Sequence, residues 1–183
     1  MKLNDKYELE INDIIQPILH KKTDRNYDTL LEKFNHRFEE TKYPGFKYAI
    51  GLLYEHHLIF SSKPNKYFMY YTDAANQSYL PAVIKLCELY IYDLYYETTL
   101  LGVNVYAQDN YKELKNDAYG EYLLAKYGMI RSLIMKDEYE DFNDALVLMK
   151  ESAYKGCLDA KEFLKKTKLE NENKLDILKI AAY

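Results

Sequence analysis

A helical pattern that recurs along the middle of the chain constrains the fold most, because each copy has a small residue at the same place. An amphipathic segment around Gly51 is followed 36 residues later by a similar segment around Cys87. A third segment has Ala125 at the matching position, 38 residues after Cys87. Two helices approach closely only where the side chains at their contact are small. The recurrence therefore predicts helices packed in pairs and a repeat architecture.

A second kind of segment follows the first and carries two adjacent small residues near its end. In segment 67–78 these are Ala74 and Ala75, and in segment 145–156 they are Ser152 and Ala153. Small pairs of this kind let the second helix of a hairpin lie close against the first. The pattern predicts helical hairpins, each stacked on the next.

The rest of the chain also favours helices. Apolar residues recur at steps of three and four over residues 5–20 and 25–39, and Asp24 stands where the second of these helices needs an N-terminal cap. The 183 residues include only 6 Gly and 4 Pro, too few for the frequent turns of a β-sandwich or barrel. The fold class predicted is all-α.

Three features resemble a known family. The order Ala-x-Gly-x-Tyr-x-Leu-Ala at Ala118–Ala125, the core Ile50–Tyr54 and the paired small residues near the end of the second helix are similar to Sel1-like repeats. These are relatives of the tetratricopeptide repeat, whose unit of ~34 residues is a pair of antiparallel helices. The resemblance covers residues 43–167 and implies a short right-handed α-solenoid. The segment 106–116, where a second helix of the middle unit is expected, lacks the paired small residues.

This resemblance divides the chain into three parts. Residues 1–42 are expected to form an N-terminal helical cap, residues 43–167 about three Sel1-like repeats, and residues 168–183 a C-terminal capping helix.

Charge and composition exclude several classes of protein. The chain has 25 basic and 29 acidic residues, and only Arg25, Arg37 and Arg131 are arginines, which is unlike a protein that neutralises nucleic-acid phosphates. The N-terminal sequence contains acids where a signal peptide needs apolar residues, and no stretch reaches the ~18 apolar residues of a membrane helix. We expect no nucleic-acid partner, no membrane contact and a cytoplasmic location.

Residues that could carry chemistry form no recognisable constellation. His56 and His57 are neighbours, and neighbours on a helix point about 100° apart, which is poor geometry for holding one metal ion. Cys87 and Cys157 have no metal-ligand spacing, and the acidic residues at 137–144 lack the order of a calcium loop. We expect no enzyme activity, no metal and no cofactor.

A groove lined by the first helix of each unit is the predicted binding surface. If the units stack like tetratricopeptide repeats, the positions three before and one, four and five after each small residue face this groove. These are Tyr48, Leu52, Glu55, His56, Ile84, Glu88, Ile91, Tyr92, Tyr122 and Lys126, followed by Met129 and Ile130. Aromatic and aliphatic residues with a few charges are typical of interface cores, although some of these residues could instead pack against the cap or the longer third unit.

Two functions fit such a surface. The first is an adaptor or scaffold that binds another protein or a peptide, as the resemblance implies, and the second is an immunity protein that neutralises a specific bacterial toxin or effector. Self-association is left open. The 21 Tyr residues, with no Trp, suit either function because tyrosine is a common interface anchor.

Overall fold

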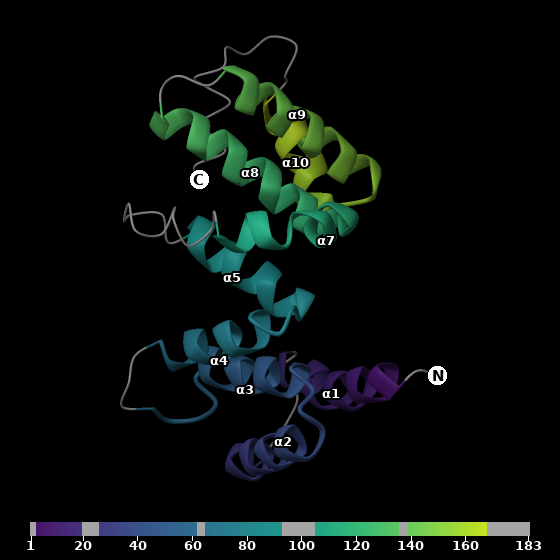
Figure 1. The fold of residues 1–183 in the computed structure, drawn as a ribbon, viewed down its shortest axis with the longest axis vertical. Coiled ribbons are helices and arrows are strands. Elements are labelled where there is room, and N and C mark those ends of the chain that lie inside the picture. The colour runs from purple at the N-terminus through teal and green to yellow at the C-terminus, as the bar shows by residue number, and fades with distance from the viewer. Residues whose placement is uncertain (1–2, 20–25, 62–64, 93–104, 136–138, 168–183) are drawn as a thin grey trace. The chain divides into compact units, whose positions relative to one another are not determined.

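The computed structural model describes residues 3–19, 26–61, 65–92, 105–135 and 139–167, and these residues form helices joined by short turns (Figure 1). The described ranges contain no strand, which confirms the all-α prediction. No helix in them is long and apolar enough to span a bilayer. Contacts divide the chain into two compact units, unit 1, Met1–Val83, and unit 2, Ile84–Tyr183. The capping helix predicted for residues 168–183 lies outside the described residues.

The described residues of unit 1 form four complete helices and the start of α5 (Leu80–Tyr92). The four complete helices are α1 (Leu3–Leu19), α2 (Tyr27–Thr41), α3 (Gly45–Glu55) and α4 (Lys66–Ala75). The cap of α2 is Asn26 rather than the predicted Asp24. The side-chain oxygen of Asn26 accepts hydrogen bonds from the backbone N–H groups of Asp28 at 3.1 Å and Thr29 at 3.2 Å. It thereby satisfies two donors that have no partner within the helix.

Helices α3 and α4 form an antiparallel hairpin in which the predicted small residues lie at the contact. Gly51 of α3 faces the ring of Tyr71, which is fully buried in α4. Ala74 and Ala75 at the end of α4 are buried as well. At the other end of the hairpin the ring of Tyr54 stacks on that of Tyr70, with centroids 5.5 Å apart. The prediction of a hairpin with small residues at its crossing is confirmed here.

Helix α1 is tied to the start and the end of this hairpin through Glu8. The hydroxyl of Tyr43, just before α3, donates to one oxygen of the Glu8 carboxylate. The hydroxyl of Tyr79, just after α4, donates to the other oxygen at 3.1 Å. One carboxylate therefore fixes two tyrosines that are 36 residues apart in sequence.

Unit 2 begins within helix α5 and continues through four more labelled helices. Helix α5 spans Leu80–Tyr92 and crosses the unit boundary; α7 (Tyr111–Asn116), α8 (Ala118–Met135), α9 (Tyr139–Tyr154) and α10 (Leu158–Thr167) follow. A short helical turn at 105–109 precedes α7. The segment expected as one helix over 106–116 is thus divided in two, with the break at Asn110.

Helices α8 and α9 form the second antiparallel hairpin, and Figure 1 shows them side by side. The hydroxyl of Ser152, near the end of α9, donates to the backbone carbonyl of Ala118 at the start of α8, at 2.6 Å. Ala125 and Ala153 are buried in the same unit. Of the paired small residues predicted for this segment, Ser152 lies at the contact with α8 and Ala153 is buried.

Helix α7 approaches α8 closely because Gly120 has no side chain. A Cβ built at Gly120 would lie 2.7 Å from the carbonyl oxygen of Leu114. Asp117, between the helices, accepts a hydrogen bond from the Gly120 N–H at 2.8 Å and so caps the start of α8. This contact places α7 and the turn before it along one side of α8.

Candidate functional site

The residues predicted to line a groove are distributed over the two units and differ in exposure. Tyr48, Leu52, Glu55 and His56 belong to unit 1, and Ile84, Glu88, Ile91, Tyr92, Tyr122 and Lys126 belong to unit 2. Leu52, Ile91, Tyr122 and Lys126 are buried, as are Met129 and Ile130. Tyr48, Glu55, Ile84 and Glu88 are half-buried, and His56 is exposed at the end of α3. The side chain of Tyr92 lies outside the described part of the chain.

Several of these residues have partners within their own unit. The Tyr48 ring lies 5.5 Å from the rings of both Tyr71 and Tyr79, and the Tyr71 hydroxyl donates to Glu55. In unit 2, Glu88 accepts a hydrogen bond from Tyr119 at 3.1 Å. These contacts hold neighbouring elements together.

Burial also affects two groups that can titrate. The pKa of Lys126, which is only 4% exposed, is lowered because burial disfavours its charged form. Burial raises the pKa of the Cys87 thiol to about 12, so that it stays protonated near neutral pH and is a poor nucleophile. The described residues contain no group of three or more His, Cys, Asp or Glu side chains placed to hold a metal ion.

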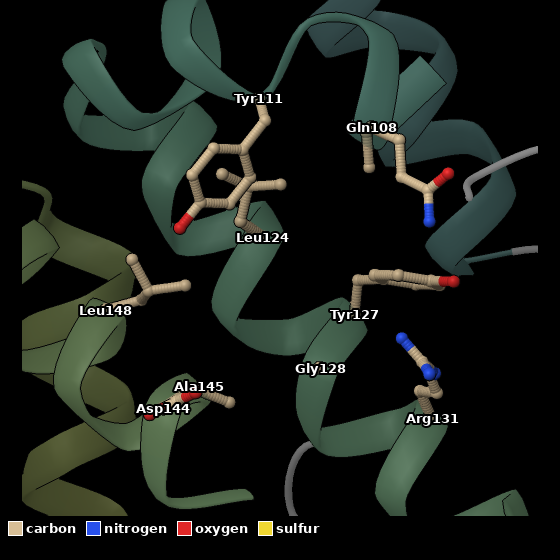
Figure 2. Close-up of a pocket in the computed structure, with 10 residues that line it drawn as sticks. Gln108, Tyr111, Leu124, Tyr127, Gly128, Arg131, Asp144, Ala145 and Leu148 are labelled. Atoms are coloured by element: carbon tan, nitrogen blue, oxygen red, sulfur yellow. The ribbon is translucent and has the colours of Figure 1, made fainter. Parts of the chain in front are cut away.

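A pocket of about 250 Å³ lies in unit 2 and is the candidate site (Figure 2). Its floor is one stripe of helix α8. The stripe consists of Leu124, Tyr127, Gly128 and Arg131. Tyr127, Gly128 and Arg131 lie three, four and seven positions after Leu124, so all four residues share one face of the helix. The four residues thus form one continuous surface along α8. Gly128 contributes no side chain to this surface.

Two walls rise from this floor, one on each side. Ala107, Gln108 and Tyr111, from the turn at 105–109 and the start of α7, form the first wall. Asp144, Ala145 and Leu148 of α9 form the second. The close approach at Gly120 positions the first wall, and the α8–α9 hairpin positions the second.

Apolar groups line most of the pocket, and polar groups stand at its edge. In Figure 2 the ring of Tyr127 lies between the amide of Gln108 and the guanidinium of Arg131. Asp144 stands on the opposite wall and is exposed, whereas Arg131 is half-buried. A largely apolar pocket with one cation on its floor and one anion on a wall can take an uncharged side chain and orient the polar groups beside it.

Fold and pocket together define an all-helical protein with helical hairpins and a small open pocket. No family model, no curated protein and no solved structure matches the chain.

The pocket uses a different face of α8 from the face that the sequence predicted. The predicted residues Tyr122 and Lys126 are buried, and the pocket stripe begins at Leu124. The spacing of Leu124, Tyr127 and Arg131 is itself a readable signal of a mixed apolar and polar face. Whether that face is open or covered depends on which elements pack against α8. Here it depends on residues 105–111, which are not part of the stripe and precede it in the sequence.

Proposed function

We propose that the chain is a non-catalytic protein-interaction module of the Sel1-like helical-repeat kind, and that the unit 2 pocket receives a side chain of a partner protein. The observation that carries this proposal is the size of the pocket. Pockets that enclose small-molecule ligands measure ~300–1,000 Å³, and this one measures about 250 Å³ and is open to solvent. A side chain presented from a protein surface suits that volume better than a ligand that must be enclosed.

The residues of the pocket support the same function. Tyrosine and arginine are, with tryptophan, the residue types enriched among the energetically dominant positions of interfaces, and Tyr111, Tyr127 and Arg131 all line this pocket. Acid–base catalysis by carboxylates commonly uses a pair of them. The residues lining the pocket include a single carboxylate, that of Asp144, which is exposed.

The helical hairpins support the repeat part of the proposal. Hairpins α3–α4 and α8–α9 each have a predicted small residue at the helix contact, Gly51 and Ser152, and hairpins packed in this way are the units from which α-solenoids are built. Proteins of that architecture commonly present binding surfaces to other proteins.

Site-specific crosslinking tests the proposal. A photoreactive p-benzoylphenylalanine at Tyr111, which is 46% exposed and lines the pocket, should crosslink a protein in a lysate of the source cells. The same group at Tyr154, which is 94% exposed and outside the pocket, is the matched control. A crosslink from position 111 should be lost in Tyr127→Ala and Arg131→Glu, and kept in Tyr154→Ala and Lys161→Glu.

The outcomes of the crosslinking experiment test the proposal and distinguish an adaptor from a dedicated inhibitor. A crosslink that survives the pocket variants, or that forms equally from position 154, would overturn the proposal. One partner held at one-to-one stoichiometry would indicate a dedicated inhibitor, such as an immunity protein. Several partners that share a short segment would indicate an adaptor.

A further inference from the structure

Helix α7 is too short to hold its own position beside the pocket. It spans only six residues, Tyr111–Asn116, whereas isolated helices shorter than ~12 residues are marginal in water. Its first residue, Tyr111, belongs to the first wall of the pocket, and the turn at 105–109 leads into it. Contacts made by the rest of α7 therefore fix this wall in place.

One of these contacts joins α7 to α8, the helix that forms the floor of the pocket. Leu114 of α7 is fully buried, and a Cβ built at Gly120 of α8 would lie 3.0 Å from its Cα. This contact holds α7 against the floor. It does not join α7 to α9, which forms the opposite wall, so the distance between the two walls needs a further contact.

Lys155, the first residue after α9, supplies that contact. Its Nζ donates to the backbone carbonyl of Lys115, near the end of α7, at 2.6 Å. The same Nζ lies 2.9 Å from Oε2 of Glu121, a fully buried carboxylate in the first turn of α8. A second ion pair, 3.8 Å between Nζ of Lys115 and Oε2 of Glu151 on α9, is weaker because both side chains are more than 40% exposed.

A cation suits the place that Lys155 occupies. The last carbonyl groups of a helix have no partner within the helix and carry a partial negative charge. The Lys115 carbonyl belongs to the last turn of α7, and the ammonium group of Lys155 satisfies it. The Glu121 carboxylate keeps the ammonium group there, because a buried anion left without its cation is costly.

We infer that Lys155 is a positioning residue for the pocket: its ammonium group holds the end of α7 to the α8–α9 hairpin and thereby sets the distance between the two walls. Lys155 itself does not line the pocket. The inference rests on the proposed function, since it assigns Lys155 a role in binding the partner. Without the ammonium group the end of α7 is released, and the first wall is no longer held at a fixed distance from the second.

Hydrogen–deuterium exchange of the full chain tests the inference without a partner. Lys155→Met removes the ammonium group and keeps a long side chain. The amides of segment 105–116 should then exchange about tenfold faster, which is the effect of losing one hydrogen bond to a charged group. Lys150→Met removes an exposed lysine from α9 and should leave exchange in this segment within about twofold of the parent protein.

A double variant separates positioning from stability. Glu121→Leu, Lys155→Met leaves no buried charge without its counter-ion, so the core of the α8–α9 hairpin should exchange as in the parent protein. Segment 105–116 should still exchange about tenfold faster, because the Lys115 carbonyl has lost its donor. A residue that only stabilised unit 2 would instead let both regions return to the parent rates together.

The crosslink from position 111 connects the wall to binding. In the double variant its yield should fall about threefold or more, because a wall that is no longer held loses contacts with the partner. Parent-like exchange of segment 105–116 in the double variant would overturn the inference and leave the proposed function in place. Faster exchange with an unchanged crosslink would also overturn it, by showing that binding does not need the wall to be held. If the parent protein forms no crosslink, the proposed function fails, and the exchange of segment 105–116 alone decides whether Lys155 positions the wall.

Discussion

The ring of Tyr71 in α4 occupies the space that a side chain at Gly51 in α3 would need. A Cβ built at position 51 would lie 2.6 Å from Cδ1 of that ring. Tyr71 cannot easily move aside, because it is fully buried, its hydroxyl donates to Glu55, and the rings of Tyr48 and Tyr67 lie 5.5 and 6.0 Å away. The absent side chain thus sets how closely α3 and α4 approach.

Gly51→Ala should therefore lower the free energy of unfolding by about 1–2 kcal/mol, because overpacking outweighs the better helix propensity of alanine. Urea denaturation measures the loss. The double variant Gly51→Ala, Tyr71→Leu should lose less than the sum of the two single variants, since the smaller side chain makes room for the new methyl group. An unchanged melting temperature for Gly51→Ala would mean that Tyr71 yields at little cost.

Glu8 should stabilise unit 1 because two tyrosine hydroxyls donate to it, from Tyr43 and Tyr79. Glu8→Ala leaves both hydroxyls without their acceptor and should lower the free energy of unfolding by about 1–3 kcal/mol. Glu8→Gln keeps one acceptor oxygen and should lose less. Asp13→Ala, at an exposed position on the same helix, is the control and should stay within about 0.5 kcal/mol of the parent protein.

Alkaline pH should destabilise unit 1 through its buried tyrosines. Burial raises the pKa of Tyr71, helped by the neighbouring Glu55 carboxylate, and burial with Glu8 raises the pKa of Tyr79. In the unfolded chain these hydroxyls ionise near the ordinary pKa of about 10. The folded state keeps these protons, so the stability that the two tyrosines contribute is fully present below about pH 10 and is lost above it.

The slope of the free energy of unfolding against pH shows how many tyrosines are responsible for the fall. Each tyrosine that stays protonated only when folded should contribute about 1.4 kcal/mol per pH unit above pH 10. Urea denaturation at a series of pH values measures the slope. Tyr71→Phe should reduce the slope by the contribution of one tyrosine. A slope unaffected by Tyr71→Phe would show that this hydroxyl ionises while the protein is folded.

The sequence predicts the hairpins well because their determinants are local and recur. Gly51 and Ser152 lie at helix contacts, and Ala74, Ala75 and Ala153 are buried, as close packing of helices requires of small residues. Helix ends are predicted less well. Helix α4 ends at Ala75, short of the predicted 78, and Ser78 adopts a left-handed φ of 57° that stops a helix.

The pocket could not be predicted from the same pattern. Periodicity identifies Tyr122, Lys126 and Tyr127 as residues of one helix, yet it does not say which of them the neighbouring elements cover. That depends on where α7 lies, and the position of α7 follows from Gly120, whose missing side chain the sequence pattern did not single out as a contact.

Unit 2 has a carboxylate in its interior. Glu121 is fully buried in α8, and Nζ of Lys155 lies 2.9 Å from its Oε2. Lys155 also donates to the backbone carbonyl of Lys115 at 2.6 Å, and so joins α7 to α8. The side chain of Lys155 is 36% exposed, so water partly screens this pair.

Removing Lys155 alone should lower the free energy of unfolding more than removing Lys155 and the Glu121 carboxylate together. Lys155→Met leaves the Glu121 charge buried without its counter-ion and should lower the free energy of unfolding by about 1–3 kcal/mol, less than for a fully buried pair. Lys150→Met, at an exposed position on α9 just before Lys155 in the chain, is the matched control and should have an effect below about 0.5 kcal/mol. The double variant Glu121→Leu, Lys155→Met should recover most of the loss, because apolar residues avoid the cost of burying a charge. If the double variant is instead less stable than Lys155→Met alone, the carboxylate contributes to stability by a contact other than this ion pair.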